Sequence, residues 1–288
     1  MTEKEFLKNY DMSKYERPSV AVDMVVFTIK DFQEENYRKL PQKKLSILMI
    51  KRGNYPFKDK WALAGGFVMK GESTEQSAKR ELFEETGVEN IYLEQLYTFS
   101  EPQRDPRGWI MSCSYMALVD SQRLNAHAGD DAKEVDWFNV DYDLTQEIET
   151  TSSDGIKTIE KHYTLTLQSN DGITLKSKVC YKTHLTIGGS WSELVEIDSN
   201  LAFDHAKIIS YAIERLRNKL EYTTIAFNLL PNTFTFTDLQ MVHETILGRK
   251  LLSANFRRKM KKYVVPADET QSQSAGHRPA KLMKRSFI

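Results

Sequence analysis

The sequence predicts an α+β fold in two modules, a strand-rich module with one short acidic helix and then a winged helix-turn-helix. Apolar runs at residues 20–29 and 45–50 are typical of buried strands, and a glutamate-rich helical pattern follows them. Beyond residue 204 the pattern becomes helical and basic. Residues 204–288 hold 15 Lys and Arg against 7 Asp and Glu, whereas residues 1–203 hold 25 against 33. This division of charge indicates two modules with different partners.

Residues 66–88 carry the most specific pattern in the chain. A glycine is followed after five residues by a glutamate, and seven residues later comes the run Arg-Glu-Leu-Phe-Glu-Glu-Thr-Gly-Val. Ser73 and Gln76 stand three residues apart, which predicts a capping box at the start of a helix. Gly87 occupies the place where a helix usually ends in a left-handed residue. The segment is therefore predicted to be loop, helix and loop.

Three carboxylates fall on one face of that helix, because Glu81, Glu84 and Glu85 are spaced i, i+3 and i+4. Arg80 precedes Glu84 by four residues and is expected to neutralise one carboxylate. A hard divalent cation, Mg²⁺ or Mn²⁺, suits the other carboxylates. Gly66 lets the backbone approach such an ion or a phosphate closely. The alternative is a solvated helix face, which clustered glutamates more often form.

The complete pattern resembles the signature of the Nudix hydrolases, which cleave nucleoside diphosphates linked to another group. The resemblance implies an α/β/α sandwich with a mixed sheet. It also implies Mg²⁺ (or Mn²⁺) held mainly by Glu81 and Glu85 with help from Glu84, while Arg80 orients the glutamates and Glu72 braces the loop. The expected chemistry is metal-assisted attack of water on phosphorus.

The flanking segments resemble the ADP-ribose-directed branch of that family and the Nudix-related transcriptional regulators of NAD metabolism. Ala64 stands where those relatives usually place a proline before the paired glycines. The resemblance is carried by Arg52 and by residues 55–57, 61–68, 92–96 and 101–108.

The same segments supply candidate substrate-binding residues. Arginines can bind a diphosphate and aromatic rings can stack on adenine. Taken singly, each is more often an ordinary surface or core residue. The candidates are Arg52, Phe57, Trp61, Gly66, Arg104 and Arg107.

The general base, or an additional carboxylate ligand, usually lies on a later loop in this family. Residues 129–138 match that region, and Asp131 is the chosen candidate, with Asp130 and Glu134 as alternatives. An acidic loop that is only solvated is the competing interpretation.

The Nudix domain is predicted at residues 1–203 and includes a β-rich insertion at about 142–197. Alternating segments at 157–168 and 173–182 flank Ser-Asn-Asp-Gly, a strong hairpin signal. We favour a decorative extension of the sheet over a dimer contact or a substrate lid. A linker helix at 204–221 and a winged helix-turn-helix domain at 222–288 complete the chain.

In the last domain, Thr237 and Gln240 predict a capping box, and Gly248 is expected to end the same helix. Ser253 is the predicted N-cap of a second, basic helix, on which Phe256 and Met260 face inward. A basic hairpin would follow from residue 264 to 285. The candidate DNA-binding residues are Asn255, Arg257, Arg258, Lys259, Lys262 and Arg278, in a helix for the major groove and a wing for phosphate. Packing or dimerisation is the alternative use of such a domain.

Two cysteines far apart in the sequence, Cys113 and Cys180, predict reduced thiols in a cytoplasmic protein. No apolar run approaches 18 residues, so no membrane partner is expected.

The first functional hypothesis is a hydrolase that converts ADP-ribose, or a related nucleoside diphosphate sugar, to AMP and a sugar phosphate. The alternative is a homodimeric regulator that binds double-stranded DNA and responds to ADP-ribose. A hydrolase with a merely architectural tail is the third option.

Overall fold

The computed structural model describes residues 1–32, 42–124, 132–271 and 280–286. Most of the strands belong to one sheet. Its strands are β1 (Ser19–Phe32), β2 (Gln42–Arg52), β3 (Trp61–Ala62), β4 (Ala64–Phe67), β5 (Tyr92–Phe99), β6 (Ile110–Leu118), β7 (Ala132–Thr151), β8 (Lys157–Ser169), β9 (Thr174–Thr186) and β10 (Gly189–Ser199).

The sheet is mixed, as the family resemblance implies. Its main path runs β10-β9-β8-β7-β2-β1-β6-β5, with β3 beside β2 and β4 beside β1. Strands β1 and β6 run parallel, with Val22 opposite Cys113, and the other pairs are antiparallel. The middle of β1 is buried on both faces, so it reads as a nearly continuous apolar run.

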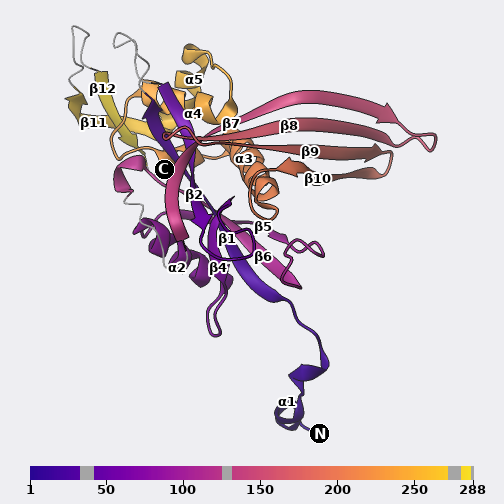
Figure 1. The fold of residues 1–288 in the computed structure, drawn as a ribbon. Coiled ribbons are helices and arrows are strands. Elements are labelled where there is room, and N and C mark those ends of the chain that lie inside the picture. Colours follow the sequence, from indigo (N-terminus) through magenta and orange to yellow (C-terminus); the bar gives the residue numbers. More distant parts are fainter. Residues whose placement is uncertain (33–41, 125–131, 272–279, 287–288) are drawn as a thin grey trace.

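Helices cover both faces of this sheet. Helix α2 (Thr74–Thr86) buries Ala78 and Leu82 against Val22 and Met24 of β1 on one face. Helix α3 (His205–Tyr222) packs on the opposite face, where its apolar stripe meets Phe27 and its neighbours. The predicted α/β/α sandwich is therefore confirmed (Figure 1).

The outer strands extend far beyond the sandwich. In Figure 1, the end of β7 and strands β8, β9 and β10 project together from the body, and we call residues 143–199 the β-arm. Strands β8 and β9 pair from Gln168 opposite Thr174 to Lys157 opposite Leu185, which confirms the hairpin predicted from Ser-Asn-Asp-Gly. The polar stretch that follows Phe138 is not a connection, because β7 continues without interruption to Thr151.

The C-terminal module consists of α4 (Phe236–Leu247), α5 (Ser253–Met260) and the hairpin β11 (Val264–Gln271) and β12 (Ala280–Arg285). Gly248 ends α4 in the left-handed conformation, as expected. The predicted caps were wrong, because Thr235 and Asp238 form the capping box of α4, two residues earlier. Ser253 is the first residue of α5, and Leu252 precedes it without a side-chain cap.

The C-terminal module is packed directly onto the sheet. Leu239, Val242 and Ile246 of α4 belong to the same apolar core as Ile47 of β2 and the buried face of α3. A 3-10 turn at Ile225–Leu229 fills the space between α3 and α4. By contrast, the short N-terminal helix α1 (Glu3–Asn9) lies apart from the body and buries no residue (Figure 1). Within the described part of the chain, no helix is long and apolar enough to cross a membrane.

Candidate active site

Local sequence fixes helix α2 at both ends. The Gln76 backbone N–H donates to the Ser73 hydroxyl, and the Ser73 backbone N–H donates to Oε1 of Gln76, which confirms the predicted capping box. Gly87 adopts φ 66° and ends the helix, also as predicted. With both ends fixed, the glutamate face turns toward the sheet: Glu81 and Glu85 are only 8% and 7% exposed.

Glu81 lies directly against the backbone of Gly66 in β4. A Cβ atom added to Gly66 would stand 2.1 Å from Oε1 of Glu81, far inside contact distance. This position needs glycine because of that close approach, so the loop and the helix form one cradle for the carboxylate. The first glycine and the glutamates of the 66–88 pattern are thus joined in space.

Arg80 contacts three carboxylates. Its guanidinium lies 3.0 Å from Glu72, 2.7 Å from Glu81 and 3.3 Å from Glu84. Arg80 was expected to neutralise one carboxylate, that of Glu84, whereas in the structure it contacts Glu72 and Glu81 as well. The bond from Arg80 holds the pKa of Glu72 at about 2. Burial raises the pKa of Glu81, although Arg80 opposes that rise.

These side chains open into a cavity of about 720 Å³ between α2, the sheet and the first turn of α3. Its wall combines acidic groups from α2 with arginines and an aromatic ring from other elements, the mixture typical of a polar ligand site. The lining includes Asp23, Arg52, Gly66, Arg80, Glu81, Glu84, Glu85, Arg104, Asp105, Arg107, Phe203 and His205.

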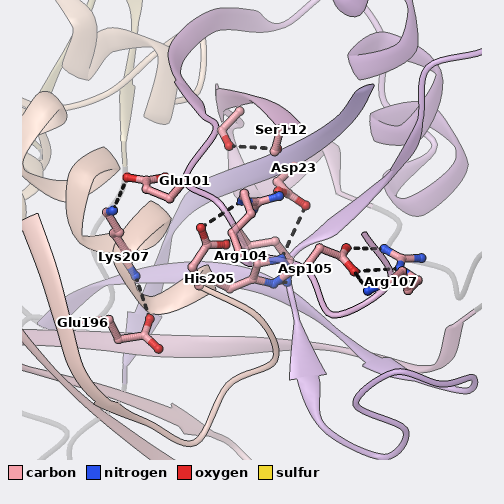
Figure 2. A network of polar contacts seen from close by, with 12 residues as sticks. Asp23, Glu101, Arg104, Asp105, Arg107, Ser112, Glu196, His205 and Lys207 are labelled. Carbon is pink, nitrogen blue, oxygen red and sulfur yellow. Dashed lines mark hydrogen bonds and ion pairs between the residues drawn. The ribbon is translucent and has the colours of Figure 1, made fainter. Parts of the chain in front are cut away.

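A buried polar network forms the floor of the cavity, as Figure 2 shows. Arg104 is bidentate to Asp204, at 2.9 and 2.6 Å, and lies 3.4 Å from Asp23. His205 Nδ1 accepts a hydrogen bond from the Leu63 backbone at 2.8 Å, so the ring proton lies on Nε2, 3.5 Å from Asp23. Burial opposes ionisation of Asp23, but His205 and Arg104 outweigh it and hold its pKa below the ordinary value.

The first turn of α3 is tied to its surroundings by further polar contacts (Figure 2). Glu196 of β10 accepts a hydrogen bond from the Lys207 backbone at 3.3 Å and so serves a helix end that lacks a side-chain cap from Asp204. Burial raises the pKa of Glu196 to about 7. The Lys207 ammonium reaches Glu101 at 2.5 Å. Strand, loop and helix are therefore held together beside the cavity.

Phe203 is the aromatic centre of the cavity wall. The guanidinium of Arg52 lies 4.9 Å and that of Arg107 lies 5.6 Å from its ring centroid. Arg52 also donates to the Pro56 carbonyl at 2.7 Å, and Arg107 is paired with Asp105 at 2.7 Å. The two predicted arginines therefore flank one ring.

Some predicted residues lie elsewhere. Trp61 is only 4% exposed and packs edge to face on Phe138 in the core, so its ring faces no ligand, contrary to its assignment as an adenine platform. Phe57 is absent from the cavity lining and contacts it only through Phe203, 4.7 Å away. Arg104, assigned to the diphosphate, does line the cavity, but its guanidinium is buried between two carboxylates. The assignments of Asp131, Asp130 and Arg278 lie outside the described residues.

Glu134, an alternative candidate for the base, is exposed on β7 and pairs with Lys51 at 3.1 Å. It does not line the cavity. Sequence reasoning missed Asp23, Phe203 and His205 as site residues. The signal for two of them was the run Leu-Ala-Phe-Asp-His at residues 201–205.

The residues of the cavity suit a hard divalent cation. Glu81, Glu84 and Glu85 offer carboxylate oxygens only, the donors that Mg²⁺ and Mn²⁺ prefer. Because Gly66 has no Cβ, the Glu81 carboxylate can lie directly against its backbone. The donor set and the cradle therefore fit such an ion.

A second polar surface lies on α5 and the 3-10 turn after it. Phe256 and Met260 are buried, as predicted, and the remaining side chains are exposed. Arg258 bonds to Asn255 at 3.2 Å and Lys259 reaches the Glu221 carbonyl at 3.3 Å. A shallow basic hollow is lined by Arg258, Lys259, Lys261 and Lys262.

Comparisons with known proteins agree with both modules. Residues 37–153 match the NUDIX domain, and residues 226–284 match the NrtR DNA-binding winged helix domain. The chain is 31% identical to the "ADPR responsive transcriptional repressor NtrR" of Acinetobacter baylyi, over 98% of the chain and 88% of that protein. It is 39% identical to the "ADP-ribose pyrophosphatase" of Methanocaldococcus jannaschii, over 48% of the chain and 73% of that protein.

Among solved structures, Shewanella oneidensis NrtR in complex with a 27mer DNA aligns over 93% of both chains, with 25% identity and a TM-score of 0.58. The chain belongs to the family of Nudix-related transcriptional regulators, which join a Nudix domain to an NrtR-type winged helix.

Proposed function

We propose that the chain hydrolyses the diphosphate of ADP-ribose, or of a closely related nucleoside diphosphate sugar, to AMP and a sugar phosphate. The observation that carries this proposal is the placement of Glu81 and Glu85, buried at the edge of the cavity beside Gly66. The similarity to an ADP-ribose pyrophosphatase over 140 residues supports it.

Glu81 and Glu85, assisted by Glu84, would hold Mg²⁺ or Mn²⁺ in this reaction. The bound ion would supply charge neutralisation on the phosphoryl oxygens. Arg80 orients Glu81 and opposes the rise in its pKa that burial causes. Arg52 and Arg107 present positive charge beside Phe203, a suitable wall for a diphosphate joined to a flat base. Water attacks one phosphorus, and the bridging oxygen leaves with the other phosphate.

The test is AMP release from ADP-ribose by the purified chain in Mg²⁺, compared with Glu85→Gln. We expect Glu85→Gln to lose at least about 100-fold in kcat/KM, because an essential ligand is removed. Lys79→Gln, on the solvent side of the same helix, is the matched control and should retain activity. Native protein that releases no AMP across a panel of nucleoside diphosphates contradicts this function.

A second function is proposed because the similarity to a repressor spans nearly the whole chain. In it the protein is a homodimeric, DNA-binding regulator, and ADP-ribose is its effector. The exposed Asn255, Arg257, Arg258 and Lys259 of α5 supply the basic face for a DNA groove, and Lys262 extends it. The two functions are compatible, since both use the same cavity.

Helix α3 provides a physical connection between the cavity and the winged helix. It begins at His205 in the cavity floor and spans roughly 27 Å over its 18 residues. Near its far end, Arg217 donates to the Ile246 carbonyl of α4 at 3.0 Å. Glu221 accepts from Lys259 of α5 at 3.3 Å. A ligand that competes for Arg104 or His205 would therefore act on the helix that carries the DNA-binding module.

The regulator proposal is tested by DNA binding at increasing salt, with and without ADP-ribose. Arg257→Ala with Arg258→Ala should lower the slope of log K against log salt by about 2. Lys79→Gln with Lys70→Gln, two lysines remote from α5, is the matched charge control. ADP-ribose should change the affinity for DNA in Glu85→Gln as well, in which turnover is blocked. No DNA binding at low salt, or a slope unchanged by the double variant, contradicts the proposal.

A further inference from the structure

Glu160, His162 and Cys180 gather on the β-arm, away from the cavity. Their ligand atoms all lie within 4.8 Å of one another. His162 and Cys180 face each other across strands β8 and β9, and Glu160 precedes His162 by two residues on the same side of β8. Tyr163 and Tyr181, on the opposite side, pack into the core beneath α3. The three residues therefore occupy the outer face of the β-arm, which neither proposed function uses.

The spacing of these atoms matches tetrahedral zinc. Zinc at its usual bond lengths to sulfur, nitrogen and oxygen separates neighbouring ligand atoms by about 3.4–3.6 Å. In the structure, His162 Nε2 lies 3.8 Å from Cys180 Sγ and 3.4 Å from Glu160 Oε2. One nitrogen thus faces both other ligands. The remaining distance, between the Cys180 sulfur and the Glu160 carboxylate, is at most 4.8 Å and would have to shorten on binding.

The neighbours leave the coordinating atoms available. Lys182 binds the other carboxylate oxygen of Glu160, Oε1, at 3.1 Å and leaves Oε2 directed at His162. A lysine in this place orients the carboxylate, as groups around metal ligands commonly do. Cys180 is only 1% exposed, whereas His162 and Glu160 are half-buried, so the site has one buried ligand and two that solvent reaches in part.

Charge also balances at the site. A Cys180 thiolate and a Glu160 carboxylate neutralise a divalent ion, and Glu193 of β10, opposite Lys182 in the sheet register, provides negative charge near the Lys182 ammonium. Strand β10 places Val195 opposite Cys180, and β7 places Gln146 opposite His162. A thiolate with an imidazole selects zinc over magnesium.

We propose that the outer face of the β-arm is a zinc site in which Glu160, His162 and Cys180 supply three ligands and solvent the fourth. Binding transfers one proton from the Cys180 thiol to solvent, and the Nδ1 atom of His162 keeps its proton. The ion would link β8 to β9 on the face of the sheet opposite Tyr163 and Tyr181. Its effect is to stiffen the β-arm.

The test uses Co²⁺ as a spectroscopic substitute for zinc, in the full-length chain with excess Mg²⁺ to occupy the Nudix carboxylates. We expect one equivalent of Co²⁺ to give tetrahedral d–d bands and a thiolate-to-cobalt charge-transfer band, both removed by one equivalent of Zn²⁺. Cys180→Ser should abolish the charge-transfer band. His162→Gln, at a half-buried position that tolerates change, should weaken Zn²⁺ binding about 10- to 100-fold in calorimetric titration.

Two controls separate this site from other thiols and imidazoles. Cys113→Ser removes the other cysteine, and His184→Gln removes another histidine of the β-arm, which bonds Thr158 at 3.0 Å. Both should bind Co²⁺ like the native chain. Folded native protein without a thiolate-to-cobalt band overturns the proposal. A band that survives in folded Cys180→Ser, or affinity unchanged in His162→Gln, overturns it as well.

Discussion

Single atoms decide whether the glutamates can assemble at the cavity. The nearest oxygen of Glu81 occupies the volume that a side chain at position 66 would require, at 2.1 Å. Gly66→Ala must therefore push Glu81 away from the edge of the cavity. We expect about a 10- to 100-fold loss of divalent-ion affinity with little change in fold, measured by Mn²⁺ titration. Gly188→Ala, which meets nothing closer than 3.9 Å, is the control. Equal ion affinity in both variants contradicts the role given to Gly66.

Arg104 gives a second prediction at this scale. Its side chain is 5% exposed and holds Asp23 and Asp204. Arg104→Ala leaves two carboxylates poorly compensated and should destabilise the fold by about 3–5 kcal/mol, measured by urea unfolding. Adding Asp204→Asn should recover part of that loss. Lys79→Ala breaks an exposed pair and should cost at most about 0.5 kcal/mol. Comparable losses in the two single variants would show that Arg104 is not a buried ion-pair partner.

Helix ends were the elements most open to sequence reasoning, but only where one capping residue stood alone. Ser73, Gln76 and Gly87 bound α2 as predicted. In α4 two threonines compete, and Thr235 with Asp238 forms the cap because Phe236 enters the helix. Both threonines offer a local capping pattern, Thr235 with Asp238 and Thr237 with Gln240, and the structure uses the first.

Helices α4 and α5 are joined by His243, which packs on Phe256 at 4.9 Å and bonds the Leu239 carbonyl. Burial lowers its pKa, so folding favours the neutral ring. The contribution of neutral His243 to the free energy of unfolding should be fully present above the pKa of the unfolded chain, about 6.5. It should be lost as the pH falls through the lower pKa of His243 in the folded protein. Urea unfolding above and below this range checks it. His243→Gln should show a smaller acid loss than the native chain, and His184→Gln the same loss. An identical acid loss in His243→Gln contradicts the prediction.

At the scale of the whole molecule, one apolar core extends from the sheet through α3 to the winged helix. We therefore expect the two modules to unfold in a single transition. Ile213 of α3 is fully buried in this core, and Ile213→Ala should cost about 2–5 kcal/mol. Calorimetry should show one unfolding transition. Spectroscopic probes in the two modules should give the same midpoint, and Ile213→Ala should lower both midpoints together. Tyr222→Ala, at the exposed end of α3, is the control. Two resolved transitions would contradict a shared core.

Features formed by residues close together in the chain could be predicted from the sequence, whereas contacts between distant residues could not. The glutamate helix and its caps lie within 23 residues, so their geometry follows from local rules. The cavity floor joins Asp23 to His205, and the ring of Phe203 meets Arg52 and Arg107. Such contacts depend on the order of strands in the sheet, which residue spacing does not contain. Trp61 shows the converse error, because an aromatic residue beside a motif was taken for a binding surface.

The position of His205 has a consequence for how such a protein can evolve. Because the floor of the cavity is also the opening turn of α3, substitutions of the glutamates on α2 leave this turn intact. Under the two functions proposed above, the loss of a few carboxylates would convert a hydrolase into a pure sensor. The reverse path, from sensor to catalyst, requires rebuilding an entire acidic face.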